Sequence, residues 1–168
     1  MQARSLLVFL LLTLVACGGA TGVSSSKLVG QPAPEFTLPR LDGQQVALSS
    51  LHGKVVVLDI WACWCDSCRK ELPRLDELAA RHKADGLAVV AVSTDEHRSE
   101  VERMIARRPS WTMTVLLDPS GKIAENYVAD SLPLVYVIDR DGLIRYRGNV
   151  SDEEQAQRLE REVTALLQ

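Results

Sequence analysis

Two cysteines separated by two residues, Cys65 and Cys68, lie where an apolar run meets a helical pattern. Residues 55–60 are almost continuously apolar, which is typical of a strand buried on both faces of a sheet. After the cysteines, leucine and alanine recur at helical spacing to about residue 83. The chain must therefore start a helix soon after a buried strand ends. A Cys-X-X-Cys pair at such a junction is typical of a dithiol redox site.

The other segments alternate between strand-like and helical patterns. Asp42 and Gly43 predict the turn of an N-terminal β-hairpin. Further strands are expected at residues 87–92, 111–117, 134–138 and 143–147, and helices at residues 99–108, 122–127 and 151–167. For the last helix, Ser151 is the expected N-cap, with Glu154 completing a capping box. This order predicts one α/β domain with a central mixed sheet and helices on both faces.

Composition narrows the class of protein. The chain has 168 residues, 46% of them hydrophobic and 24% charged, which is ordinary for one globular domain. Its net charge of −3 and the absence of a dense basic cluster argue against a nucleic-acid surface.

The N-terminal segment has the pattern of an export signal. Arg4 precedes an apolar run at residues 6–15 that is too short to span a bilayer comfortably. The following Leu-Val-Ala-Cys ends at Cys17 and resembles a bacterial lipobox, which implies cleavage before Cys17 and lipidation of its sulfur. The alternative is an ordinary signal peptide with an incidental cysteine. We expect a lipoprotein signal peptide at residues 1–16, a flexible tether at 17–27 and the folded domain at 28–168.

Helix position assigns different roles to the two cysteines. Cys65 is expected at the start of the helix, where unpaired backbone N–H groups and the helix dipole stabilise a thiolate. Cys68 lies one turn inside on the same face and should be less accessible. Cys65 is therefore the expected exposed attacking sulfur, and Cys68 the resolving one. The alternatives are two structural cysteines or half of a zinc site, but no histidine has ligand spacing to them.

Four segments together resemble the thioredoxin superfamily, and most closely its TlpA/ResA-like branch of membrane-tethered bacterial thiol–disulfide oxidoreductases. They are GQPAPEFTL at residues 30–38, LHGKVVVL at 51–58, WACWCDSC at 61–68 and SLPLVYVID at 131–139. The resemblance covers about residues 28–168. It implies a thioredoxin-like fold with an N-terminal β-hairpin and a helix-containing insertion near residues 94–112.

The resemblance also implies roles for two prolines. Pro133 matches the cis-proline that faces the dithiol, so the backbone of Leu132 is expected to pair with an extended substrate peptide. The alternative is a trans proline opening a strand. Pro73 matches the position where the family kinks the active-site helix.

Asp59 is a carboxylate inside the apolar strand, where the TlpA/ResA-like branch often has Asn. Desolvation should raise its pKa. It is then placed to accept and return the proton of Cys68 during resolution. The alternative is a solvent-facing Asp at a strand edge.

Other residues around the dithiol also depart from the branch. Asp66 beside Cys65 disfavours its thiolate and so favours a reductant, and a hydrogen bond from Ser67 would partly offset this. Cys63 is an additional thiol, which we interpret mainly as a bystander. A capping site for small thiols and a third metal ligand are the alternatives.

The remaining residues of the stretch are aromatic or charged. Trp64 is expected to shield and shape the approach to Cys65, whereas Trp61 is as consistent with core packing as with a contact surface. The charged residues after Cys68 are expected to form the solvated face of the helix; they are Arg69, Lys70 and Glu71.

We therefore expect a lipid-anchored, monomeric oxidoreductase of the bacterial cell envelope, facing the periplasm or the exterior, that reduces protein disulfides without an organic cofactor. The resemblance implies apocytochrome c or another envelope protein as substrate and a DsbD/CcdA-type membrane electron donor. One alternative is a peroxiredoxin-like peroxidase, although residues 62–65 lack the proline loop of that class. The other is a copper or zinc carrier that uses Cys63, Cys65 and Cys68.

Overall fold

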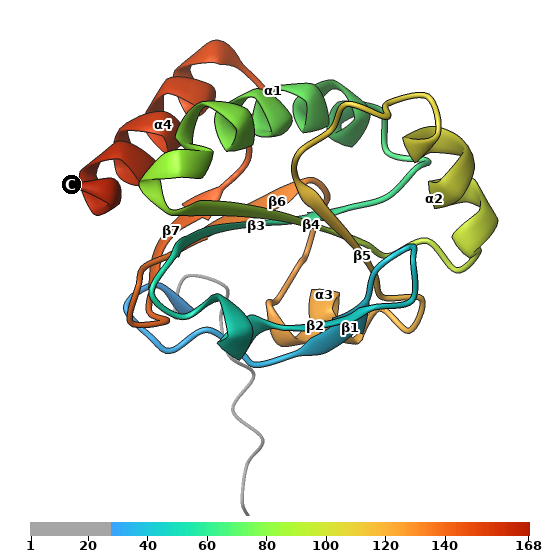
Figure 1. Cartoon of the computed structure of the whole chain (residues 1–168), viewed down its shortest axis with the longest axis horizontal. Helices are drawn as coiled ribbons and strands as arrows, with labels where there is room; N and C mark the ends of the chain where they lie inside the picture. The colour runs from blue at the N-terminus through green and yellow to red at the C-terminus, as the bar shows by residue number, and fades with distance from the viewer. Residues whose placement is uncertain (1–27) are drawn as a thin grey trace, which may run out of the picture.

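Five strands form the central sheet, in the spatial order β5-β4-β3-β6-β7 (Figure 1). The computed structural model describes residues 28–168, so the expected signal peptide, Cys17 and the tether lie outside the described residues. The elements are β1 (Thr37–Pro39), β2 (Gln45–Ala47), η2 (Leu48–Leu51), β3 (Val55–Trp61), α1 (Asp66–His82), η3 (Lys83–Asp85), β4 (Leu87–Ser93), α2 (Arg98–Ile105), β5 (Thr114–Leu117), α3 (Lys122–Asn126), β6 (Leu134–Ile138), β7 (Ile144–Gly148) and α4 (Glu153–Leu167).

The strand β3 lies at the centre of this sheet. It pairs in parallel with β4 and antiparallel with β6, while β5 extends the parallel side and β7 the antiparallel side. All seven residues of β3 are buried. A central strand covered on both faces needs apolar side chains in both directions, which explains why the run is continuous rather than alternating. The predicted mixed sheet of an α/β fold is confirmed.

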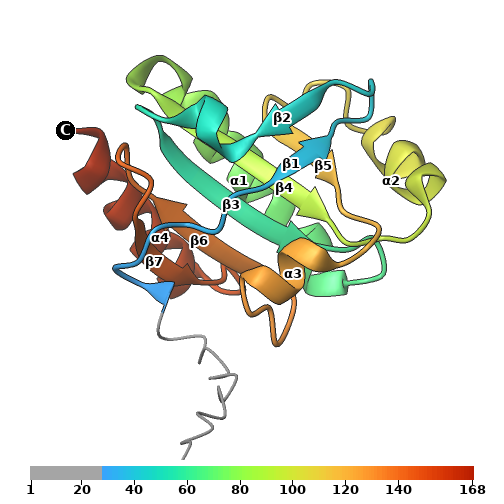
Figure 2. The ribbon, with the colours of Figure 1, turned by 90° about the horizontal axis from the view of Figure 1, so that it is seen from below.

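Helices and the N-terminal segment cover opposite faces of the sheet. The helices α1 and α4 lie on one face, and α3 with the β1-β2 hairpin lies on the other (Figures 1 and 2). Two buried apolar layers correspond to these faces, the first containing Leu72 of α1 and Leu159 of α4, the second containing Ile123 of α3. The N-terminal hairpin is confirmed, and the region 94–112 contains α2.

Several element boundaries differ from the sequence prediction. The strand expected at residues 111–117 starts only at Thr114, and α2 ends at Ile105 instead of residue 108. The prediction that Ser151 caps the last helix is wrong. The N-cap of α4 is Asp152, whose side chain accepts the N–H of Gln155 at 2.9 Å. Asp and Ser are comparably good caps, so composition alone could not choose between adjacent residues.

Pro73 lies inside α1, as the family position implied. Between residues 28 and 168, none of the helices combines the length and the apolar character that crossing a bilayer demands.

Candidate active site

A disulfide joins Cys65 and Cys68 where α1 begins, with their Cα atoms 5.3 Å apart. Cys65 is the N-cap residue, and its Sγ accepts the backbone N–H of Cys68 at 3.1 Å. The sulfur therefore receives the kind of hydrogen bond that stabilises a thiolate at a helix start.

Both cysteines of the pair are buried in this oxidised state. Cys65 is 6% exposed and Cys68 1% exposed. The sequence prediction of an exposed Cys65 is therefore wrong, because the first turn of α1 packs its sulfur into the apolar layer beneath the helix. The predicted difference in accessibility is confirmed, since Cys65 is more exposed than Cys68.

The two residues between the cysteines make different contacts. The Oγ of Ser67 lies 3.4 Å from the Sγ of Cys65. Asp66 is exposed and forms an ion pair with Arg69, which also donates to the backbone oxygen of Cys63 at 2.6 Å. The guanidinium offsets part of the Asp66 charge, so the influence of Asp66 on the neighbouring sulfur is weaker than the sequence alone implied.

Asp59 is a buried carboxylate on the α1 side of the sheet. It is 1% exposed, and strand alternation places it on the same face as Val57 and Trp61, both of which belong to the apolar layer that contains the disulfide. Its two oxygens make no hydrogen bond within residues 28–168. Burial raises the pKa of Asp59 well above its ordinary value, and the negative charge of Glu71 raises it further. The alternative of a solvent-facing Asp is excluded.

Glu71 is the functional candidate that the sequence reasoning assigned wrongly. It was expected on the solvated face of the helix but is only 1% exposed. Burial raises the pKa of Glu71 to about 7, although the Val150 backbone and Arg74 oppose the rise. The spacing along the helix indicates this burial, because a residue three positions after Cys68 and one before Leu72 lies on the buried face of α1. Arg69 and Lys70 are exposed, as predicted.

Cys63 is the free cysteine among residues 28–168, and it is half-buried. Its backbone N–H lies 3.0 and 2.8 Å from the two carboxylate oxygens of Asp95. Burial, followed by the hydrogen bond and negative charge of Asp95, raises the pKa of the Cys63 thiol to about 12. A thiol with that pKa is almost wholly protonated at neutral pH and is a poor nucleophile.

Pro133 follows a cis peptide bond from Leu132, as the family position implied. Ile60 pairs with Leu134, so Pro133 lies at the end of β3 from which the Cys65 loop leaves. Leu132 is half-buried and packs against both apolar layers. Trp64 is 71% exposed, whereas Trp61 is fully buried and therefore belongs to the core.

The described part of the chain contains no group of three His, Cys, Asp or Glu side chains arranged to hold a metal ion. The residues that the structure brings together are the disulfide, two carboxylates with raised pKa values and the cis-proline. This arrangement supports proton-coupled exchange between a disulfide and a thiol, because the carboxylates lie in the same buried layer as Cys68.

Comparison with known proteins agrees with this chemistry. Residues 29–147 match the AhpC/TSA family. The thiol-disulfide oxidoreductase ResA of Bacillus cereus is 30% identical over 152 residues, which cover 86% of this chain and 87% of the relative. The thioredoxin-like protein YneN of Bacillus subtilis is 38% identical over 135 residues, covering 78% of each chain.

A solved structure from Chlorobium tepidum, described as a thiol:disulfide interchange protein DsbE, superposes with a TM-score of 0.78 at 34% identity. The superposition covers 83% of this chain and 98% of that protein. With its Cys65–Cys68 pair at the start of α1, the chain belongs to the AhpC/TSA family and is a thioredoxin-fold thiol–disulfide oxidoreductase.

Proposed function

We propose that this protein reduces disulfides in other proteins of the cell envelope while held on a membrane by a lipid on Cys17. The observation that carries the catalytic part is the Cys65–Cys68 disulfide, which shares a buried layer with Asp59 and Glu71. Two sulfurs that cycle between dithiol and disulfide carry both electrons, so the reaction needs no organic cofactor.

The first step is attack by the Cys65 thiolate on one sulfur of the substrate disulfide. A bond forms between Cys65 and that sulfur, the substrate S–S bond breaks, and the departing substrate thiolate takes a proton from solvent. Cys65 has this role because it is the more accessible sulfur and caps α1, where the Cys68 N–H and the Ser67 hydroxyl stabilise negative charge on it.

The second step is resolution by Cys68. Its thiol gives a proton to the buried carboxylate pair, and its sulfur attacks Cys65 and displaces the second substrate thiolate, which then takes that proton from the carboxylate pair. Asp59 and Glu71 serve as the proton acceptor because burial has raised both pKa values towards the range in which a carboxylate exchanges protons at neutral pH. The substrate has gained two electrons and two protons, and the protein has lost them.

The direction of the reaction follows from the negative charges around the dithiol. A strong oxidant stabilises its reduced form through a low-pKa thiolate. Asp59 and Glu71 share the buried layer of the sulfurs, and the negative charge left on this pair when one member is ionised disfavours a thiolate there. Asp66 acts in the same sense but weakly, since Arg69 pairs with it. These residues make the couple a reductant, which in an oxidising compartment requires a membrane electron donor of the DsbD/CcdA type.

Residues beside the disulfide would hold the substrate chain. The backbone of Leu132, before the cis-proline Pro133, pairs with an extended peptide by main-chain hydrogen bonds, and exposed Trp64 covers an apolar side chain of that peptide. Apocytochrome c, which presents a cysteine pair in an unfolded segment, is one candidate substrate.

Stoichiometry tests the proposed reaction. Reduced full-length protein, mixed with a disulfide-bonded peptide, should release two peptide thiols for each Cys65–Cys68 disulfide formed. Hydrogen peroxide should oxidise the same protein far more slowly than the peptide does. Faster oxidation by peroxide than by any peptide disulfide would support a peroxidase instead. Membrane fractionation of wild type and Cys17→Ser separately tests the anchor, because only the variant should become soluble.

A further inference from the structure

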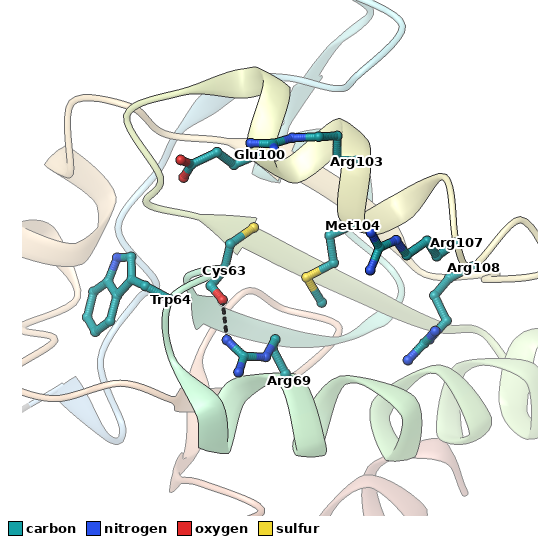
Figure 3. A pocket seen from close by; sticks show the side chains of 8 residues that line it. All are labelled: Cys63, Trp64, Arg69, Glu100, Arg103, Met104, Arg107 and Arg108. Carbon is teal, nitrogen blue, oxygen red and sulfur yellow. Dashed lines mark hydrogen bonds between the residues drawn. The ribbon is translucent and has the colours of Figure 1, made fainter.

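A groove of about 550 Å³ opens between α1 and α2 beside the redox-active disulfide (Figure 3). Arg69 borders it from α1, Arg103 from α2, and Arg107 and Arg108 from the residues that follow α2. The volume is in the range of clefts that bind ligands.

The groove is strongly basic although the chain as a whole carries a net charge of −3. Four of the lining residues are arginines, and Glu100 is the single acidic one. Within residues 28–168, no carboxylate forms an ion pair with Arg103, Arg107 or Arg108. Unpaired guanidinium groups that line one groove create a local positive potential able to bind and orient anionic groups.

The groove adjoins the reacting sulfur. Cys63 and Trp64, the two residues before Cys65, both line it. Arg69 lies one turn after Cys65 on α1 and reaches back to the Cys63 backbone oxygen. If the substrate disulfide is at Cys65, the part of the substrate chain that lies in the groove is therefore only a few residues away from that disulfide.

We propose that this groove binds an acidic segment of the substrate protein that flanks the substrate's disulfide. The proposal rests on the proposed function, since it assumes that the substrate is a protein disulfide. A peptide fits better than a membrane surface, because the arginines border a recess between α1 and α2 that has Cys63 and Trp64 at one end and Arg107 and Arg108 at the other (Figure 3). Recognition by charge would raise the association rate and favour some disulfides over others at the same dithiol.

The test compares three peptides of equal length that contain the same disulfide-bonded cysteine pair. The residues flanking this pair are Asp and Glu in the acidic peptide, Ser and Gln in the neutral Ser/Gln peptide, and Lys in the lysine peptide. The measured quantity is the second-order rate constant with which each peptide oxidises reduced full-length protein in non-ionic detergent. Wild type should react about 10-fold faster with the acidic than with the lysine peptide at low salt, and 0.5 M salt should remove most of the difference.

Charge-reversal variants locate the effect. The double variant Arg103→Glu with Arg107→Glu should lower the rate constant for the acidic peptide about 10-fold. It should leave the rate constant for the Ser/Gln peptide unchanged and raise that for the lysine peptide. The control is Lys122→Glu with Arg161→Glu, which changes the net charge equally at exposed positions on α3 and α4 and should keep the acidic preference.

The outcomes separate this proposal from the proposed function. If no peptide disulfide is reduced, the proposed function fails. If all three peptides react at equal rates, or if the groove and control variants behave alike, the groove proposal is overturned and the proposed function stands. Binding of vesicles containing anionic phosphatidylglycerol that requires Arg107, with equal peptide rates, would assign the groove to a lipid surface instead.

Discussion

The carboxylates of Asp59 and Glu71 lie on different elements, β3 and α1, yet share the buried region that contains the sulfur of Cys68. They interact closely enough that the charge on Glu71 raises the pKa of Asp59. Two such groups titrate as a pair and hold a proton between them more readily than either would alone. In the mechanism that we propose, this pair accepts and returns the proton that moves during disulfide exchange.

Asp59→Asn should slow resolution more than the initial attack at neutral pH. The amide cannot accept the proton of Cys68, whereas the Cys65 thiolate has lost its proton before it attacks. We expect at least about a 10-fold slower release of the second substrate thiol, with the first step little affected. Rapid acid quenching of a single turnover measures both steps, and Asp141→Asn, in an exposed turn, is the control. Equal slowing of both steps would remove Asp59 from proton transfer.

Glu71→Gln should make the stability of the oxidised protein less dependent on pH. The folded pKa of Glu71 is about 7, and an unfolded glutamate has a pKa of about 4.3. Between these two pKa values the folded protein binds more protons than the unfolded protein does, so the free energy of unfolding falls as pH rises. The stabilisation that protonated Glu71 gives below about pH 4.3 is therefore lost as the pH rises through 7. Between pH 5 and pH 8, the free energy of unfolding should therefore decrease by about 2 kcal/mol less in the variant than in wild type.

Urea denaturation at a series of pH values measures the effect. Glu77→Gln on the exposed face of the same helix should keep the wild-type slope. A slope unchanged in Glu71→Gln would show that Glu71 does not carry the titration.

Cys63 should be unreactive at neutral pH. Because its pKa is about 12, iodoacetamide should label it in the oxidised protein roughly 1,000-fold more slowly at pH 8 than it labels free cysteine. The labelling rate should rise about tenfold with each pH unit above that and should increase in Asp95→Asn, which removes a carboxylate that raises the pKa. Mass spectrometry of the Cys63 peptide gives the rates. Cys63→Ser should keep reductase activity within about twofold, and a larger loss would end the bystander interpretation.

Asp152→Ala should destabilise the protein by about 1 kcal/mol, because it removes the side chain that accepts the free N–H of Gln155 in the first turn of α4. Ser151→Ala, one residue earlier, should cost much less, since the Ser151 hydroxyl contacts only Gln155, and at 3.4 Å. Thermal unfolding of the two variants under identical conditions compares them. A greater loss for Ser151→Ala would restore the sequence-based cap.

The sequence predicted the parts of the fold that depend on short, strong local patterns. The continuous apolar run predicted the central strand β3, and the turn signal at Asp42 and Gly43 predicted the N-terminal hairpin. The ends of α2 and β5 were less accurate, because no cap or turn residue sharply marks them and packing between elements decides where they stop.

Within the site, the cysteine pair, buried Asp59 and cis Pro133 follow from motif and position. Glu71 was predicted wrongly because a charged side chain is usually solvated, whereas the helical phase of Glu71 relative to Cys68 places it on the buried face of α1. The ion pair of Asp66 with Arg69 and the low exposure of Cys65 depend on side-chain packing in three dimensions, which no spacing rule reports.

The central claim is that Cys65 attacks the substrate and Cys68 resolves the mixed disulfide. The most direct test is trapping with Cys68→Ser, followed by peptide mass spectrometry of the disulfide-linked adducts. We predict that substrate adducts accumulate on Cys65, and that Cys65→Ser accumulates none. Adducts carried only by Cys63, or by Cys68 in Cys65→Ser but not by Cys65 in Cys68→Ser, would contradict this assignment.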